Sequence, residues 1–149
     1  MLDLSTDDRA FAQDLRTLYN RLGNLRPVME SIGMELEGRV SSRFETRTDP
    51  NGKGWAAWSP FTQATYPKDG NRRLLDRYGD MLGSLTHKAD ASSVRVGFGQ
   101  SYATFHEFGT KHMPRRGLLF ADPEAGTLGQ EDEAAVLDVL SVWLNDLTK

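Results

Sequence analysis

A long apolar stripe in residues 26–47 is the feature that most limits the fold of this chain. Five apolar residues follow one another at intervals of four: Val28, Ile32, Leu36, Val40 and Phe44. That spacing places them along one side of a helix, and Pro27 suits the first turn of such a helix. Four-residue spacing drifts around a helix of about 3.6 residues per turn, so the buried side should wrap obliquely. The pattern predicts a helix over residues 26–47.

Two further segments carry helical patterns at the two ends of the chain. In residues 5–25, Ser5 is placed to cap a helix, and Asp8 stands three positions later. Its apolar stripe consists of Phe11, Leu15, Leu18 and Leu22. This helix and the next, joined by a short turn, should form an antiparallel or L-shaped pair. The last helix is expected over residues 131–147, where an acidic first turn suits the helix dipole.

Residues 48–70 lose all periodicity. The segment contains three Pro and three Gly, a density that breaks helices and central strands. It also carries four aromatic residues: Trp55, Trp58, Phe61 and Tyr66. Disordered linkers are usually poor in aromatic residues. We therefore expect a long loop, ordered or conditionally ordered, whose aromatic side chains pack on the domain or on a neighbouring subunit.

The region after this loop reads as a small antiparallel sheet with short helices. Residues 72–87 have a helical pattern, interrupted by two glycines. Strands are expected at Leu85–Ala89 and Ser93–Gly99, with a turn between them. A short helix at Tyr102–Gly109 and a further strand at Leu118–Ala121 should follow. The prediction is a single α+β domain over residues 1–149, with the N-terminal helix pair and the C-terminal helix packed on a sheet formed by about 85–121.

Composition excludes several classes of protein. The 149 residues include no Cys, which rules out disulfides, zinc–thiolate sites and cysteine nucleophiles. A net charge of −3 argues against a surface that grips nucleic acid everywhere. No apolar segment approaches the roughly 20 residues needed to cross a bilayer, and the acidic start does not resemble a secretory signal. We expect a soluble protein made in a cytoplasm, without contact with a membrane.

A cluster of His and Glu invites a catalytic interpretation. His106 and Glu107 are followed by His112, but a helical zinc motif needs its two histidines four residues apart, and here they are six apart. We favour a structural role, in which the His106 ring packs against the sheet with one nitrogen bonded to backbone, and Tyr102 and Phe108 help to hold the fold. The alternative is a metal-dependent hydrolase, which stoichiometric zinc would support. A nucleophile-elbow pattern and a complete phosphate-binding glycine motif are both absent from the sequence.

Two arginine pairs and the tryptophans are candidates for contacts with partners. Arg72-Arg73 and Arg115-Arg116 could form a solvated face, salt bridges between subunits, or contacts with DNA. Trp55 and Trp58 could serve an interface or local packing. Interface use predicts that replacing both tryptophans by Ala leaves the monomer folded and abolishes assembly. A free nucleic-acid-binding module built on the arginine pairs is a further alternative, marked by salt-sensitive DNA binding.

The order of several short motifs resembles the phage virion morphogenesis family, the tail completion proteins of Mu-like and related tailed phages. The motifs are Pro50, Gly52 and Trp55; Gly79 to Ser84; Val94, Val96 and Gly97; Tyr102-Ala103; His106-Glu107-Phe108-Gly109; Pro114-Arg115; and Leu118-Leu119. The chain departs from the family pattern in having Tyr78 in place of Thr, Met81 in place of Leu, and Arg116-Gly117 in place of a second Pro and an aromatic residue.

The resemblance implies a structural, non-enzymatic virion protein with no cofactor. Such a protein completes the tail and joins it to the head–portal complex as part of a ring, typically a hexamer. Its partners would be copies of itself, the tail tube or terminator protein, portal or connector proteins, and transiently the DNA in the channel. It would reside at the head–tail junction or upper tail, after assembly in the host cytoplasm. A tail terminator or neck adaptor is the nearest alternative. The expected interface residues are Trp55, Trp58, Phe61, Arg72, Arg73, Arg115 and Arg116.

Overall fold

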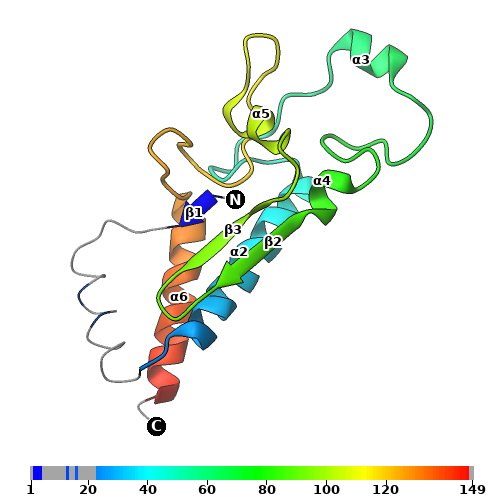
Figure 1. Ribbon diagram of the computed structural model, residues 1–149. Helices are drawn as coiled ribbons and strands as arrows, with labels where there is room; N and C mark the ends of the chain where they lie inside the picture. The colour runs from blue at the N-terminus through cyan, green and yellow to red at the C-terminus, as the bar shows by residue number, and fades with distance from the viewer. Residues whose placement is uncertain (1, 5–12, 14–15, 17–22, 148–149) are drawn as a thin grey trace.

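The computed structural model describes residues 2–4, 13, 16 and 23–147, and it shows an α+β fold as predicted (Figure 1). The elements, in chain order, are β1 (Leu2–Leu4), α2 (Arg26–Thr46), α3 (Pro60–Thr65), α4 (Asp80–Gly83), β2 (Leu85–Ala89), β3 (Val94–Phe98), α5 (Ala103–Phe108) and α6 (Gln130–Leu147). The helix predicted over residues 5–25 falls almost wholly outside the described residues.

Helix α2 is the central element and confirms the strongest prediction from the sequence. All five residues of its predicted stripe are buried, and Met29 and Gly33 are buried beside them. Pro27 occupies the first turn, as its fixed φ favours. The helix ends where Arg47 adopts a left-handed conformation with φ 57°, and the N–H of Arg47 donates to the carbonyl of Arg43 at 2.7 Å. Among the described elements, α2 therefore contributes the largest share of the buried apolar core.

The described sheet has three strands in the order β1-β3-β2, with both pairings antiparallel. The predicted hairpin of β2 and β3 is confirmed, with His87 opposite Val96. Its turn is fixed by Asp90, whose Oδ1 accepts from the N–H groups of Ser92 and Ser93 at 2.8 and 2.7 Å. β1 extends the other edge of β3, a pairing that the sequence pattern did not predict because the strand is only three residues long.

The elements form two layers that leave the remaining loops at one end. α2 lies against the sheet and α6 runs beside α2, while α3 and α5 lie beyond the end of the helices (Figure 1). His87 of β2 sits directly over Gly33 of α2, where a Cβ would come within 2.5 Å of the imidazole ring. The same ring contacts Glu37 and lies 3.0 Å from Glu30, so the carboxylates of these two glutamates flank the contact between helix and sheet.

Two predicted elements are wrong. In residues 72–87 only α4 is helical, because Leu75 and Gly79 have φ of 60° and 82° and the buried carboxylate of Asp76 binds Asn71 and Arg73 in a local turn. Residues 118–121 do not form a strand, because the N–H groups of Leu118, Leu119 and Phe120 bond to a side chain instead of to a neighbouring strand. The loop predicted over residues 48–70 is irregular as expected, except that it contains α3.

Candidate assembly surface at the loop end

The loops at one end of the molecule surround a single irregular stretch of backbone. We call residues 55–83 and 99–117 the loop end, and residues 114–121 the anchor segment. The carboxylate of Glu107, on α5, is buried and accepts three backbone N–H groups of the anchor segment. Leu118 and Leu119 donate to its Oε2 at 2.7 and 3.0 Å, and Phe120 donates to Oε1 at 2.9 Å. One side chain thus replaces the partner strand that this segment lacks.

Several carbonyl groups of the anchor segment also accept hydrogen bonds from side chains. Trp55 Nε1 donates to the carbonyl of Gly117 at 3.0 Å, and Arg43 Nη1 donates to that of Leu118 at 2.7 Å. Arg115 Nη2 donates to the carbonyl of Phe120 at 2.6 Å. Buried backbone groups are costly unless they are hydrogen-bonded, so these contacts hold an irregular chain in one conformation.

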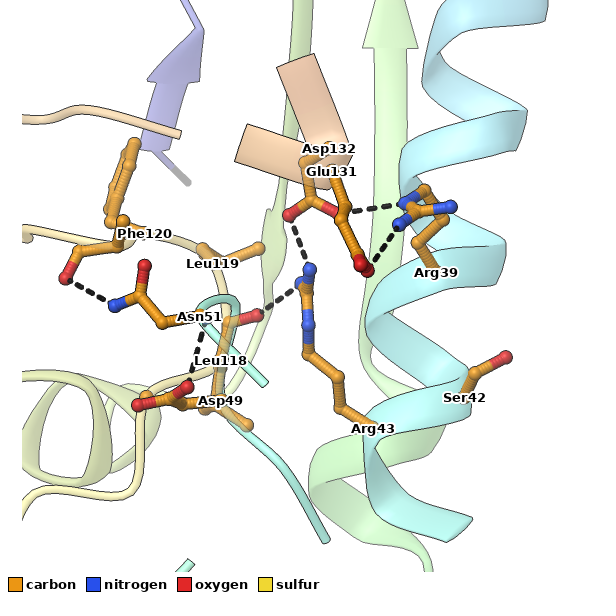
Figure 2. A network of polar contacts seen from close by, with 12 residues as sticks. Arg39, Ser42, Arg43, Asp49, Asn51, Leu118, Leu119, Phe120, Glu131 and Asp132 are labelled. Atoms are coloured by element: carbon orange, nitrogen blue, oxygen red, sulfur yellow. Dashed lines mark hydrogen bonds and ion pairs between the residues drawn. The ribbon is translucent and has the colours of Figure 1, made fainter. Parts of the chain in front are cut away.

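A buried ion pair connects the anchor segment to both long helices. Figure 2 shows Arg43 of α2 between the Leu118 carbonyl and the carboxylate of Asp132, the third residue of α6. Arg39 Nε donates to the second oxygen of Asp132 at 2.7 Å. Asp132 is only 1% exposed, so its charge is compensated almost entirely by these two guanidinium groups. The anchor segment is therefore held against the helical layer by charged side chains.

Of the expected interface residues, Trp55, Arg115 and Arg116 belong to this network of hydrogen bonds to backbone groups. Trp55 is buried edge-on against Phe44, with ring centroids 5.6 Å apart. Arg116 is buried, and its guanidinium donates to the carbonyls of Ala56 and Ala57 at 2.8 and 3.0 Å. Arg115 Nε donates to the Glu107 carbonyl at 2.7 Å. In the monomer these side chains position loops, and their use between subunits stays a prediction.

The remaining expected residues are closer to the surface. Phe61, on α3, is 77% exposed and is the most exposed large apolar side chain among those described. Trp58 is partly buried and stacks on Tyr66 with ring centroids 4.3 Å apart. Arg72 is exposed and donates to the carbonyls of Tyr66 and Pro67, whereas Arg73 bonds to Asp76 and to Glu45. Phe61 and Arg72 are thus the most accessible of the seven.

Sequence reasoning missed an aromatic row on α5. Tyr102, Phe105 and Phe108 are spaced three apart, which places them on one side of a short helix, and all three are exposed. Tyr78 is exposed as well. Tyr102 and Phe108 were expected to hold the fold, but Glu107 between them performs that task. The spacing of the three aromatic residues was a signal available in the sequence.

An open cleft of about 520 Å³ separates the α3 loop from the α5 region. Trp58, Tyr66, Tyr102, His106, His112 and Arg116 are among the residues that line it. Burial lowers the pKa of the His106 imidazole, and the nearby Arg116 charge lowers it further. Among the described residues, His106 Nδ1 has no hydrogen-bond partner, contrary to the expected backbone bond. No group of three or more potential His, Cys, Asp or Glu ligands lies together in the described part of the chain.

These observations define a class, namely a small α+β protein whose exposed aromatic side chains are concentrated on an open surface at one end. The chain belongs to the phage virion morphogenesis family, whose sequence pattern matches residues 6–145. The protein therefore has a role in building the phage virion. No curated protein and no solved structure shows detectable similarity to the chain. Within the described residues, no helix is both long and apolar enough to cross a membrane.

Proposed function

We propose that this protein completes the phage tail and joins it to the head–portal complex as one subunit of a ring. The observation that carries the proposal is the concentration of exposed aromatic side chains at the loop end, away from the core. Phe61, Phe105 and Tyr78 are each more than half exposed. Large aromatic side chains provide much of the binding energy of protein interfaces, and exposed apolar patches mark such surfaces. Membership of a virion morphogenesis family supplies the context for a partner in the particle.

The hydrogen bonds of the loop end support this role. Glu107 and Arg115 bond to backbone groups on the α5 side of the cleft, and Arg116 donates to the Ala56 carbonyl on the other side, so we expect these loops to change little when a partner binds. Binding then requires less ordering of the chain, and more of the contact energy contributes to affinity. The partners we propose are copies of this chain, the tail tube or terminator protein, and the portal or connector proteins. DNA would pass through the ring with only transient contact.

A direct test measures the mass of the purified protein by light scattering, alone and with tail tubes. We expect a ring-sized mass, or binding confined to the tube ends. Phe61→Ala should weaken association with copies or tubes about tenfold, the effect of one hot-spot residue. Met34→Ala is the matched control, because Met34 is 65% exposed on α2, away from the loop end. A strict monomer that ignores tail tubes would contradict the proposal, as would equal losses in the two variants.

The same binding measurement, repeated with purified portal or connector rings in addition to tail tubes, separates this role from the tail terminator or neck adaptor alternative. A terminator binds the last ring of the tail tube, whereas a neck adaptor binds purified portal or connector rings. Binding to tubes and to connectors together supports a joining protein. Binding to connectors alone assigns the chain to the neck.

A further inference from the structure

Charge is unevenly distributed over residues 47–147. The loop end contains seven Lys and Arg against four Asp and Glu, whereas residues 117–147 contain seven Asp and Glu and no Lys or Arg. The second range includes all of α6. Complementary charge favours contacts between unlike surfaces and opposes contacts between like ones. A second copy of this chain therefore offers a surface of opposite sign to the loop end.

Helix α6 exposes apolar side chains on the side that faces away from the core. Its core-facing side carries Leu140 and Asp132, which are buried, with Val136 and Trp143 partly buried beside Leu140. On the other side, Leu137 and Val142 are about half exposed. We call the following residues the outer face of α6: Ala134, Leu137, Asp138, Ser141 and Val142. Their spacing (134, 137, 138, 141, 142) places them in one stripe along the helix, with Leu137 and Val142 at its two edges on either side of Asp138 and Ser141, and all five are exposed.

The tip of the loop end has the complementary chemistry. Phe61 projects from α3, a helix with no buried residue. The Arg72 guanidinium lies 5.6 Å from the centre of the Tyr66 ring, and that of Arg77 lies 4.6 Å from the centre of the Tyr78 ring. Arg77 also pairs with Asp69 at 3.2 Å, whereas Arg72 forms no ion pair with a carboxylate among the described residues. Within the described part of the chain, the Arg72 guanidinium donates hydrogen bonds only to the carbonyls of Tyr66 and Pro67, so its charge has no acid beside it. An exposed Phe together with such an Arg fits a shallow apolar surface that carries an acid.

We propose that the α3 tip of one copy, with Phe61 and Arg72, binds the outer face of α6 on the next copy. Phe61 would pack between Leu137 and Val142, and Arg72 would approach Asp138. The two surfaces differ, so the contact is head-to-tail, and repetition closes a ring when the rotation per copy permits. This inference rests on the ring proposed above, and it specifies which surfaces join the subunits.

Cross-linking tests this contact, because the natural chain has no cysteine to interfere. Gln63→Cys lies on α3, and Ser141→Cys lies on the outer face of α6, both at exposed positions. The two variants are purified separately, mixed in equal amounts and oxidised, both free in solution and on tail tubes. We expect a disulfide-linked dimer from the mixture and none from either variant alone. Thr86→Cys, exposed on β2, replaces Ser141→Cys as the matched control and should give no dimer.

A charge exchange supplies a second measurement. Arg72→Asp and Asp138→Arg should each lower the mass seen by light scattering, and a mixture of the two variants should restore it. In the mixture every junction again joins opposite charges. A mixture that stays dissociated would contradict the assigned pair.

The outcomes separate this inference from the function on which it rests. If the natural protein forms rings or binds tube ends, and the mixed cysteine variants do not cross-link, the contact lies elsewhere and the function stands. Dimers from Gln63→Cys alone would indicate a symmetric contact and would also overturn the inference. If the natural protein neither associates nor binds tubes, both the function and the inference fail.

Discussion

At the scale of single residues, the fold depends on a few buried carboxylates that bind backbone or guanidinium groups. Glu107 is the clearest case, because its two oxygens accept three N–H groups from consecutive residues. Asp132 and Asp76 serve similar purposes beside arginines. Glu107 satisfies backbone donors in an irregular segment that has no helix or strand partner, whereas Asp132 and Asp76 accept from the side chains of Arg and Asn. A change in any of them leaves several buried groups unsatisfied at once.

We predict that Glu107→Gln lowers the free energy of unfolding by roughly 2–3 kcal/mol. The amide keeps one acceptor oxygen, but its NH₂ group would face N–H groups of the anchor segment. Chemical denaturation monitored by tryptophan fluorescence measures the effect. Glu124→Gln, at an exposed position, is the control and should be neutral. Equal denaturation midpoints for the two variants would show that the Glu107 contacts contribute little.

The sequence did not indicate the specific role of Glu107, and the reason is physical. Its neighbours His106 and His112 drew attention to metal chemistry, while its actual partners lie 11 to 13 residues further along the chain. No periodicity encodes a contact between a short helix and an irregular segment. Trp55 is a second example, because the aromatic residues around it in the sequence are equally compatible with a buried and with an interface position. Its burial against Phe44 now predicts that the double Trp→Ala variant is destabilised as well as assembly-deficient.

At the scale of elements, α2 contains two glycines in opposite environments. At Gly33 an added Cβ would meet the His87 ring at 2.5 and 2.8 Å and Val94 Cγ2 at 3.0 Å, so the missing side chain permits the close contact of helix and sheet. At Gly38, on the exposed side, nothing lies within 4 Å of the added atom. Replacing each glycine by Ala therefore measures the effect of helix propensity at Gly38 and the effect of packing at Gly33 within the same helix.

The expected effects of the two Gly→Ala substitutions have opposite signs. Gly38→Ala should stabilise the protein by about 0.5–1 kcal/mol, the usual gain for Ala over Gly in a helix. Gly33→Ala should destabilise it by about 1–3 kcal/mol, because overpacking against β2 outweighs that gain. Thermal and chemical denaturation of both variants measure the difference. Stabilisation by Gly33→Ala would mean that β2 moves away from α2 at little cost.

Elements with a strong local pattern were predictable, and those set by tertiary contacts were not. α2, the hairpin, α5 and α6 follow from apolar periodicity and turn residues near the predicted boundaries. The helical pattern over residues 72–87 failed because Asp76 bonds to Asn71 and Arg73, and Leu75 adopts a positive φ. Leu74 of that segment is buried without being helical. Apolar spacing alone does not distinguish these two arrangements.

At the scale of the whole molecule, two histidines give the stability opposite dependences on pH. The hydrogen bond to Glu37 raises the pKa of His87, and Glu30 raises it further, although burial opposes this. The stabilisation from His87 is therefore complete below its unfolded pKa of about 6.5 and is lost as pH rises through the folded pKa. His106 has a lowered pKa because of burial, so its contribution is lost as pH falls.

We predict that the difference in unfolding free energy between the natural protein and His87→Gln shrinks as pH rises from about 6 to 9. Urea denaturation at several pH values measures it. His112→Gln is the control, since His112 is exposed, and its difference should not vary with pH in this way. A difference that stays constant or grows with rising pH would contradict the proposed interaction of His87 with Glu30 and Glu37.

The local bonding of α3 has a consequence for how its sequence can vary between related chains. The hydrogen bonds of this helix are local: Ser59 caps it at Thr62, and Thr65 bonds back to Phe61. None of its residues is buried, so packing in the core does not restrict which residues occupy these positions. If the proposed contact holds, residues 59–65 form a recognition segment whose sequence can diverge while the folding free energy stays nearly constant. Related chains that fit different particles would be expected to differ first at this segment, and grafting it between them should transfer partner choice.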